Sequence, residues 1–209
     1  MAGELAREAL PAFPASRGNG VHPSLPGYRC VELQTSTMVR LPKNATHPKS
    51  RADWRRWLEQ NHTQQEGVWL VSYKKATGKP RFEYEESVEE AICFGWIDSK
   101  VNKLDEERSM LWFAPRKPRT GWSKPNKERV ARMLAMGLMH PAGMAKVDQA
   151  KSDGSWNSLD GVEELEVPAD LRDALAFYPN ATSHFNAFPR SVKRGILEWI
   201  HTARRPQTR

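Results

Sequence analysis

The fold is decided by residues 85–98, which read Glu85-Glu86-Ser87-Val88-Glu89-Glu90-Ala91-Ile92-Cys93-Phe94-Gly95-Trp96-Ile97-Asp98. Val88, Ala91 and Ile92 recur at helical spacing, and acidic residues near the start of this segment suit the positive end of a helix dipole. Gly95 is expected to end the helix. The residues after it alternate as in a strand, so the stretch predicts a helix that passes directly into a strand.

Extended segments surround this helix. Residues 68–73 before it are rich in β-branched and aromatic side chains, which favours a strand. After it, residues 96–102 and 110–114 read as two strands joined by the charged turn 104–107. We therefore expect a hairpin with the earlier strand beside it.

Helical periods dominate the rest of the chain. A short amphipathic helix is expected near residues 54–62, and further helices are expected at about 123–137, 141–154, 168–177, 181–187 and 189–203. In the last of these, Val192, Ile196, Trp199 and Ile200 share one stripe, which predicts that Trp199 is buried. The predicted fold class is α+β, with a small antiparallel sheet packed by helices over about 50–122 and a helical C-terminal half over about 123–209.

The first 49 residues have a different composition. They contain scattered proline and glycine and no tryptophan, whereas all eight tryptophans lie from Trp54 onward. Such a segment cannot offset its ordering entropy, so we expect a disordered leader over 1–49 and one domain over 50–209. The chain shows no secretory signal and no apolar run near the roughly 18 residues of a membrane span, which favours a cytoplasmic protein with reduced Cys30 and Cys93.

Positive charge is concentrated in two places. The formal net charge is +7, and ten Lys and Arg residues face four Asp and Glu residues between Lys100 and Arg132. A second cluster near the C-terminus consists of Lys193, Arg194, Arg204, Arg205 and Arg209. Basic patches of this kind keep nucleic-acid binding open as an alternative function.

The familiar catalytic and cofactor motifs are absent from the sequence. There is no glycine-rich nucleotide loop, no Cys-x-x-Cys pair, and no two of the six histidines share a helical face, so no metal or cofactor is expected. Cys93 stands between Ile92 and Phe94, a setting typical of a small buried hydrophobe rather than a nucleophile.

Residues 112–126 form the most informative loop. They read Trp112-Phe113-Ala114-Pro115-Arg116-Lys117-Pro118-Arg119-Thr120-Gly121-Trp122-Ser123-Lys124-Pro125-Asn126. Arginine offers planar forks for anions, tryptophan offers a stacking face, and Ser123 leads into a helix N-terminus that attracts negative charge. The loop therefore predicts a site for a small anion, and the competing interpretation is a rigid connector with core aromatics and solvated cations.

Asp98 is the second candidate. It shares a strand face with Trp96, and with Glu89 and Glu90 it offers carboxylates for acid/base chemistry, although a solvated helix face explains the two glutamates more simply. A salt bridge to a nearby arginine is the competing role of Asp98. The predicted ligand site comprises Trp96, Asp98, Arg116, Arg119, Trp122, Ser123, Lys124 and Asn126, and the catalytic residues are unknown.

Several motifs resemble the YdeI/OmpD-associated proteins, also described as bacteriocin-protection (OmdA-type) proteins. The similarity covers about residues 51–209, and its most specific elements are Phe94-Gly95-Trp96-Ile97-Asp98, Trp122-Ser123-Lys124 and the terminal Thr202-Ala203-Arg204-Arg205-Pro206. The resemblance implies a role in stress protection but no reaction, cofactor or catalytic residue. The leading hypothesis is a cytoplasmic protein that binds a small anionic ligand, with nucleic-acid binding or an enzyme using Asp98 as acid/base as alternatives.

Overall fold

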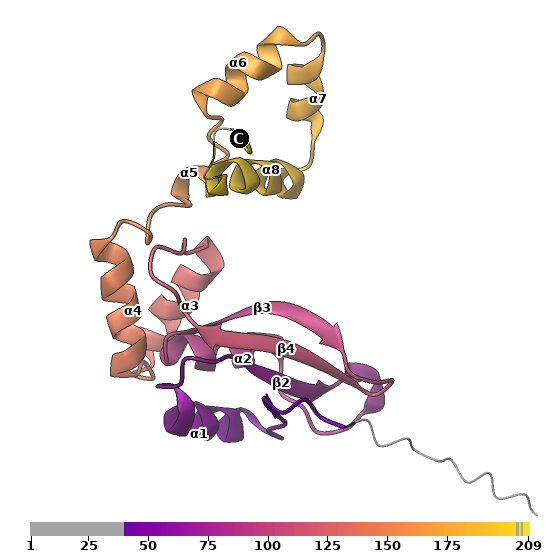
Figure 1. Ribbon diagram of the computed structural model, residues 1–209, viewed down its shortest axis with the longest axis vertical. Helices are drawn as coiled ribbons and strands as arrows, with labels where there is room; N and C mark the ends of the chain where they lie inside the picture. The colour runs from indigo at the N-terminus through magenta and orange to yellow at the C-terminus, as the bar shows by residue number, and fades with distance from the viewer. Residues whose placement is uncertain (1–39, 204, 206) are drawn as a thin grey trace, which may run out of the picture. The chain divides into compact units, whose positions relative to one another are not determined.

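The computed structural model describes residues 40–203, 205 and 207–209 (Figure 1). Most of the expected leader, together with Cys30 and Arg204, lies outside the described residues. The described part has a four-stranded sheet in its N-terminal half and helices throughout, which confirms the α+β class.

The sheet has the strand order β1-β2-β4-β3. Its strands are β1 (Ala45–Thr46), β2 (Val68–Tyr73), β3 (Trp96–Lys103) and β4 (Arg108–Pro115). β4 pairs antiparallel with β2 and with β3, so the expected hairpin and its neighbour are confirmed. β1 runs parallel to β2, and the sheet is mixed rather than purely antiparallel.

Strand β1 belongs to the segment that the composition placed in the leader. It is only two residues long, too short for any periodic signal, and the backbone N–H of Trp69 donates to the carbonyl of Asn44 at 2.8 Å just before it. The described structure therefore begins before the boundary expected at residue 50.

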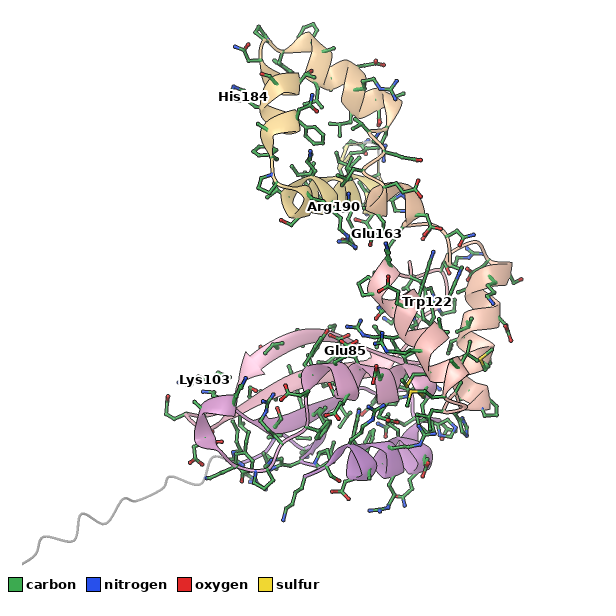
Figure 2. All side chains as sticks on the ribbon, turned by 180° about the vertical axis from the view of Figure 1, so that it is seen from behind. Glu85, Lys103, Trp122, Glu163, His184 and Arg190 are labelled. Carbon is green, nitrogen blue, oxygen red and sulfur yellow. The ribbon has the colours of Figure 1, made fainter. Side chains whose placement is uncertain are left out.

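Helices α1 (Arg51–Asn61) and α2 (Tyr84–Cys93) pack with the sheet around the main hydrophobic core. Trp54 of α1 is fully buried, and its ring packs against that of Phe113 of β4 with an angle of 52° between the ring planes. Figure 2 shows α2 in front of the strands. Gly95 has a φ of 78°, so it provides the left-handed residue that ends α2 and turns the chain into β3.

Glu89 and Glu90 of α2 are buried, so the expectation that they lie on a solvated helix face is wrong. Their side chains pair with three arginines, because Arg51 and Arg55 of α1 reach Glu90 at 2.6 and 2.7 Å and Arg132 reaches Glu89 at 2.8 Å. A single helix sequence does not indicate that arginines from two other helices converge on it.

Helices α3 (Lys124–Ala135) and α4 (Pro141–Ser152) complete this core. α4 approaches α2 closely, since a Cβ at Gly143 would collide with the carbonyl oxygen of Cys93. Cys93 itself is fully buried, as predicted for a small hydrophobe, and burial raises the pKa of its thiol to about 11.

The C-terminal helices share a second, smaller core. They are α5 (Asp160–Glu163), α6 (Ala169–Phe177), α7 (Ala181–Ala187) and α8 (Arg190–Thr202). Leu197 of α8 is buried in this core, whereas Trp199 is 66% exposed, so the prediction that Trp199 is buried is wrong. The apolar residues of α8 form one broad face, and the helical period alone did not identify that the part around Leu197 and Ile200 is buried while Trp199 lies at the exposed margin. Within the described residues, no helix combines the length and apolarity required to cross a membrane.

Candidate functional site

Arg116 is buried, with 6% of its surface exposed. Its guanidinium carbon lies 3.8 Å from the ring centroid of Trp122, and Nη2 donates to the carbonyl of Gly121 at 2.8 Å. These contacts fold the 116–122 loop back on itself. Arg116 and Trp122, both predicted as ligand-binding residues, contact each other within the loop.

The two predicted tryptophans belong to the core. Trp96 and Trp122 are 1% and 2% exposed. The Trp96 indole N–H donates to the carbonyl of His62 at 3.2 Å, and the Trp122 ring lies against Trp156. Neither offers an open stacking face, which agrees with the connector interpretation for these aromatics.

Asp98 accepts a hydrogen bond of 2.8 Å from the hydroxyl of Tyr84, in the first turn of α2. Partial burial and this hydrogen bond raise the pKa of Tyr84 to about 12, so the phenol remains the donor at neutral pH. Burial lowers the pKa of Arg116 to about 10, and the negative charge of Asp98 partly opposes this shift. Tyr84 was missed in the sequence because only the fold brings it to Asp98.

The remaining predicted residues form hydrogen bonds with separate partners. The backbone N–H of Arg119 donates to Asp153, and that of Lys124 lies 3.5 Å from Glu163. Ser123 occupies the N-cap of α3 without a side-chain capping bond, and Asn126 accepts from Arg129. The eight residues therefore do not line one cavity.

Many cations of the first basic patch are already paired. Arg129 and Arg132 bind Glu85 of α2, which Figure 2 labels, at 2.6 and 2.8 Å. Lys103, Arg108 and Lys127 also pair with carboxylates, and Arg194 does so in the C-terminal cluster. Such pairing reduces the positive potential that nucleic acid would meet.

A pocket of about 330 Å³ lies over the sheet instead. Its floor is mainly apolar and comes from one face of three strands, namely Leu70 and Ser72 of β2, Ser109 and Leu111 of β4 and Val101 of β3. Ser72 and Ser109 are directly opposite in the β2–β4 register and place two hydroxyls together on this floor. We call this cavity the sheet pocket.

The wall of the sheet pocket adds aromatic and charged groups. It includes Tyr73, Lys74, Lys75, Arg81, Phe82, Glu83, Tyr84 and Ser87. Arg81 holds Glu83 through both terminal nitrogens at 3.0 and 3.1 Å, while its buried Nε has no partner. Because Arg81 neutralises Glu83, Lys74 and Lys75 leave the wall with an excess of positive charge.

The sheet pocket was not predicted from the sequence. Its floor residues come from three separate stretches, at residues 70–72, 101 and 109–111, and no motif marks them. The signal available was Tyr73-Lys74-Lys75 at the end of a strand, which was read only as part of a family resemblance. Among the described residues, no group of three or more His, Cys, Asp or Glu side chains is placed to hold a metal ion, and independence from metal remains a prediction.

Two family models match separate parts of the chain. Residues 164–209 match the family described as bacteriocin-protection, YdeI or OmpD-associated, which confirms the predicted resemblance for the C-terminal region. Residues 46–146, which contain the sheet, match a domain of unknown function (DUF8412). Comparisons with curated proteins and with solved structures give no match.

Proposed function

We propose that this protein binds a small organic anion with an apolar body in the sheet pocket. The observation that carries the proposal is the pocket itself, about 330 Å³ in volume, with an apolar floor, a few hydroxyls and a positively charged wall. Ligand sites for small molecules have this size and this combination of surfaces.

The anionic group is assigned to the wall near Arg81. The guanidinium of Arg81 lines the pocket and brings a fixed positive charge to its wall, although both of its terminal nitrogens bind Glu83. Lys75 is exposed, lines the same pocket and adds attraction for a carboxylate or sulfonate. The apolar body of the ligand would then cover Leu70, Leu111 and Val101.

This proposal keeps the small anionic ligand expected from the sequence but moves its site. In the predicted loop, Arg116 and Trp122 contact each other and stabilise the loop. The sheet pocket, in contrast, has a volume large enough for a small ligand. Tyr84 rather than Asp98 lines the pocket, so binding is better supported than acid/base catalysis by Asp98. A cytoplasmic role in stress protection, suggested by the resemblance, would use this binding.

Calorimetric titration with octanoate and octanol tests the proposal. Octanoate should bind wild type at least about tenfold more tightly than octanol, a difference of about 1.4 kcal/mol, because only octanoate has a negative charge. Arg81→Gln should remove this preference, and Leu111→Trp should weaken both ligands by filling the floor.

Arg56→Gln is the matched control, because Arg56 is an exposed arginine of α1 that pairs with Asp53 away from the sheet pocket. It should bind both ligands as wild type does. Absence of octanoate binding, or equal effects of the Arg81 and Arg56 substitutions, would contradict the proposal.

A further inference from the structure

Helix α4 begins with an unusual cap, the side chain of His140. Its Nδ1 accepts the backbone N–H of Ala142 at 3.2 Å, and a ring nitrogen that accepts this bond carries no proton of its own. Serine, threonine, aspartate and asparagine are the usual residues at this position, and their acceptors persist near neutral pH. His140 is therefore a cap that works only in its neutral form, and histidine titrates close to neutral pH.

The same residue fastens α4 to the C-terminal end of α2. The backbone N–H of His140 donates to the carbonyl of Cys93 at 3.1 Å, and its imidazole stacks on the ring of Phe94 at a centroid distance of 4.8 Å. The carbonyl of His140 accepts the N–H groups of Gly143 and Met144 at 3.0 and 3.1 Å. His140 thus joins the first turn of α4 to α2 through its backbone and its ring.

Positive charge faces His140 from helix α1. The ring of His62 lies 4.8 Å from that of His140, and Arg55 is held nearby because it donates to the carbonyl of Leu138 at 3.0 Å. Glu59 opposes these charges only in part, and it lies 3.4 Å from Arg55 in an ion pair. Burial, followed by the charges of His62 and Arg55, lowers the pKa of His140 from its ordinary value of 6.5.

The other two helices at this junction add no free negative charge among the described residues. Glu90 of α2 is already bound by two arginines of α1, at 2.6 and 2.7 Å, and the Cys93 thiol, with its pKa raised to about 11, is neutral. Lys146 of α4 lies against the Gly95 turn that ends α2 and is a further cation. A proton on His140 therefore breaks the cap and places a positive charge at a helix N-terminus that already faces cations.

We infer that His62 and His140 form an acid-sensitive latch, in which neutral His140 holds the first turn of α4 on the end of α2 and a proton on His140 releases that turn. Because the folded state holds this proton less tightly than the unfolded chain, the contribution of the cap to stability is present above pH 6.5 and is lost as the pH falls below it. Charge on His62 makes release require a more acidic solution. The latch is separate from the sheet pocket and does not depend on the proposed function.

Amide hydrogen exchange, measured by NMR in the full chain at pH 7 and pH 5, tests the latch. The protection factors of Ala142, Gly143 and Met144 should fall by at least about threefold at the lower pH, as expected for the loss of an N-cap, while those of α3 stay unchanged. His140→Asn should remove this pH dependence, because asparagine offers an acceptor that does not titrate. His184→Asn is the control, since His184 is an exposed histidine of α7, and it should behave as wild type does.

Titration of the imidazole NMR signals reports on the proton itself and also decides the case in which His140→Asn fails to fold. His140 of wild type should titrate with a midpoint below 6.5, and His62→Gln should raise that midpoint because a nearby positive charge is removed. Unchanged protection of the α4 first turn at pH 5, the same loss in His140→Asn, or a His140 midpoint that His62→Gln does not move would overturn the inference.

Discussion

The Tyr84 hydroxyl donates a hydrogen bond of 2.8 Å to Oδ2 of Asp98 and joins the first turn of α2 to strand β3 at the margin of the sheet pocket. Because the folded state holds the phenol proton more tightly than the unfolded chain, the pKa of Tyr84 rises from 10.0 to about 12. Its contribution to stability is therefore complete below pH 10 and is lost as the pH rises toward 12.

Absorbance at 295 nm measures this titration directly. Wild type should show one late-titrating tyrosine, and Tyr84→Phe should lack it. Asp98→Ala should move that titration to lower pH, because the carboxylate no longer stabilises the neutral phenol. Unchanged late titration in Tyr84→Phe would show that another tyrosine is responsible.

Glu90→Gln should destabilise the protein by about 3 kcal/mol, because it leaves two arginines facing an uncharged group in a buried network. Glu90 is 2% exposed and pairs with both Arg51 and Arg55. Urea unfolding gives the free energy. The control Glu59→Gln breaks an exposed pair with Arg55 and should cost no more than about 0.5 kcal/mol; equal losses would argue against the buried network.

Leu197→Ala should cost about 2–5 kcal/mol, the usual range for emptying a buried leucine position, whereas Trp199→Ala should cost far less. Leu197 is 2% exposed and Trp199 is 66% exposed on the same helix. Thermal and urea unfolding of the two variants compare them. A larger loss for Trp199→Ala would restore the helix phase that the sequence predicted.

A chain that begins at residue 50 should be less stable by at least about 1 kcal/mol than one that begins at residue 40, because it loses β1 and its backbone hydrogen bonds to β2. The bond between Trp69 and Asn44 is one of them. Denaturant unfolding of both chains measures the difference. Equal stabilities would support the boundary first expected at residue 50.

The sequence correctly predicted elements that are long enough to show a helical or strand period. Strand β2 and helix α7 have the bounds expected from their patterns, and the hairpin of β3 and β4 was predicted with its neighbour. β1 is too short to have a period, and α5, with four residues, was missed for the same reason. Local patterns also did not determine which part of the broad apolar face of α8 is buried.

The site was harder to predict because it depends on contacts between distant residues. The residue types of the 112–126 loop predicted that Arg116 and Trp122 belong to a ligand site, whereas the structure shows that both are buried and contact each other. The floor of the sheet pocket is assembled by strand register, as the opposed Ser72 and Ser109 show. Neither register nor side-chain burial is visible in the order of residues alone.

Backbone amide NMR during titration with octanoate tests the central claim most directly, since it shows where the ligand binds as well as whether it binds. We predict saturable shift changes concentrated in β2, in β4 and in residues 81–87, and their loss in Leu111→Trp. Shift changes centred instead on the exposed cations Lys117, Arg119 and Lys124, or no saturable change at all, would contradict the account.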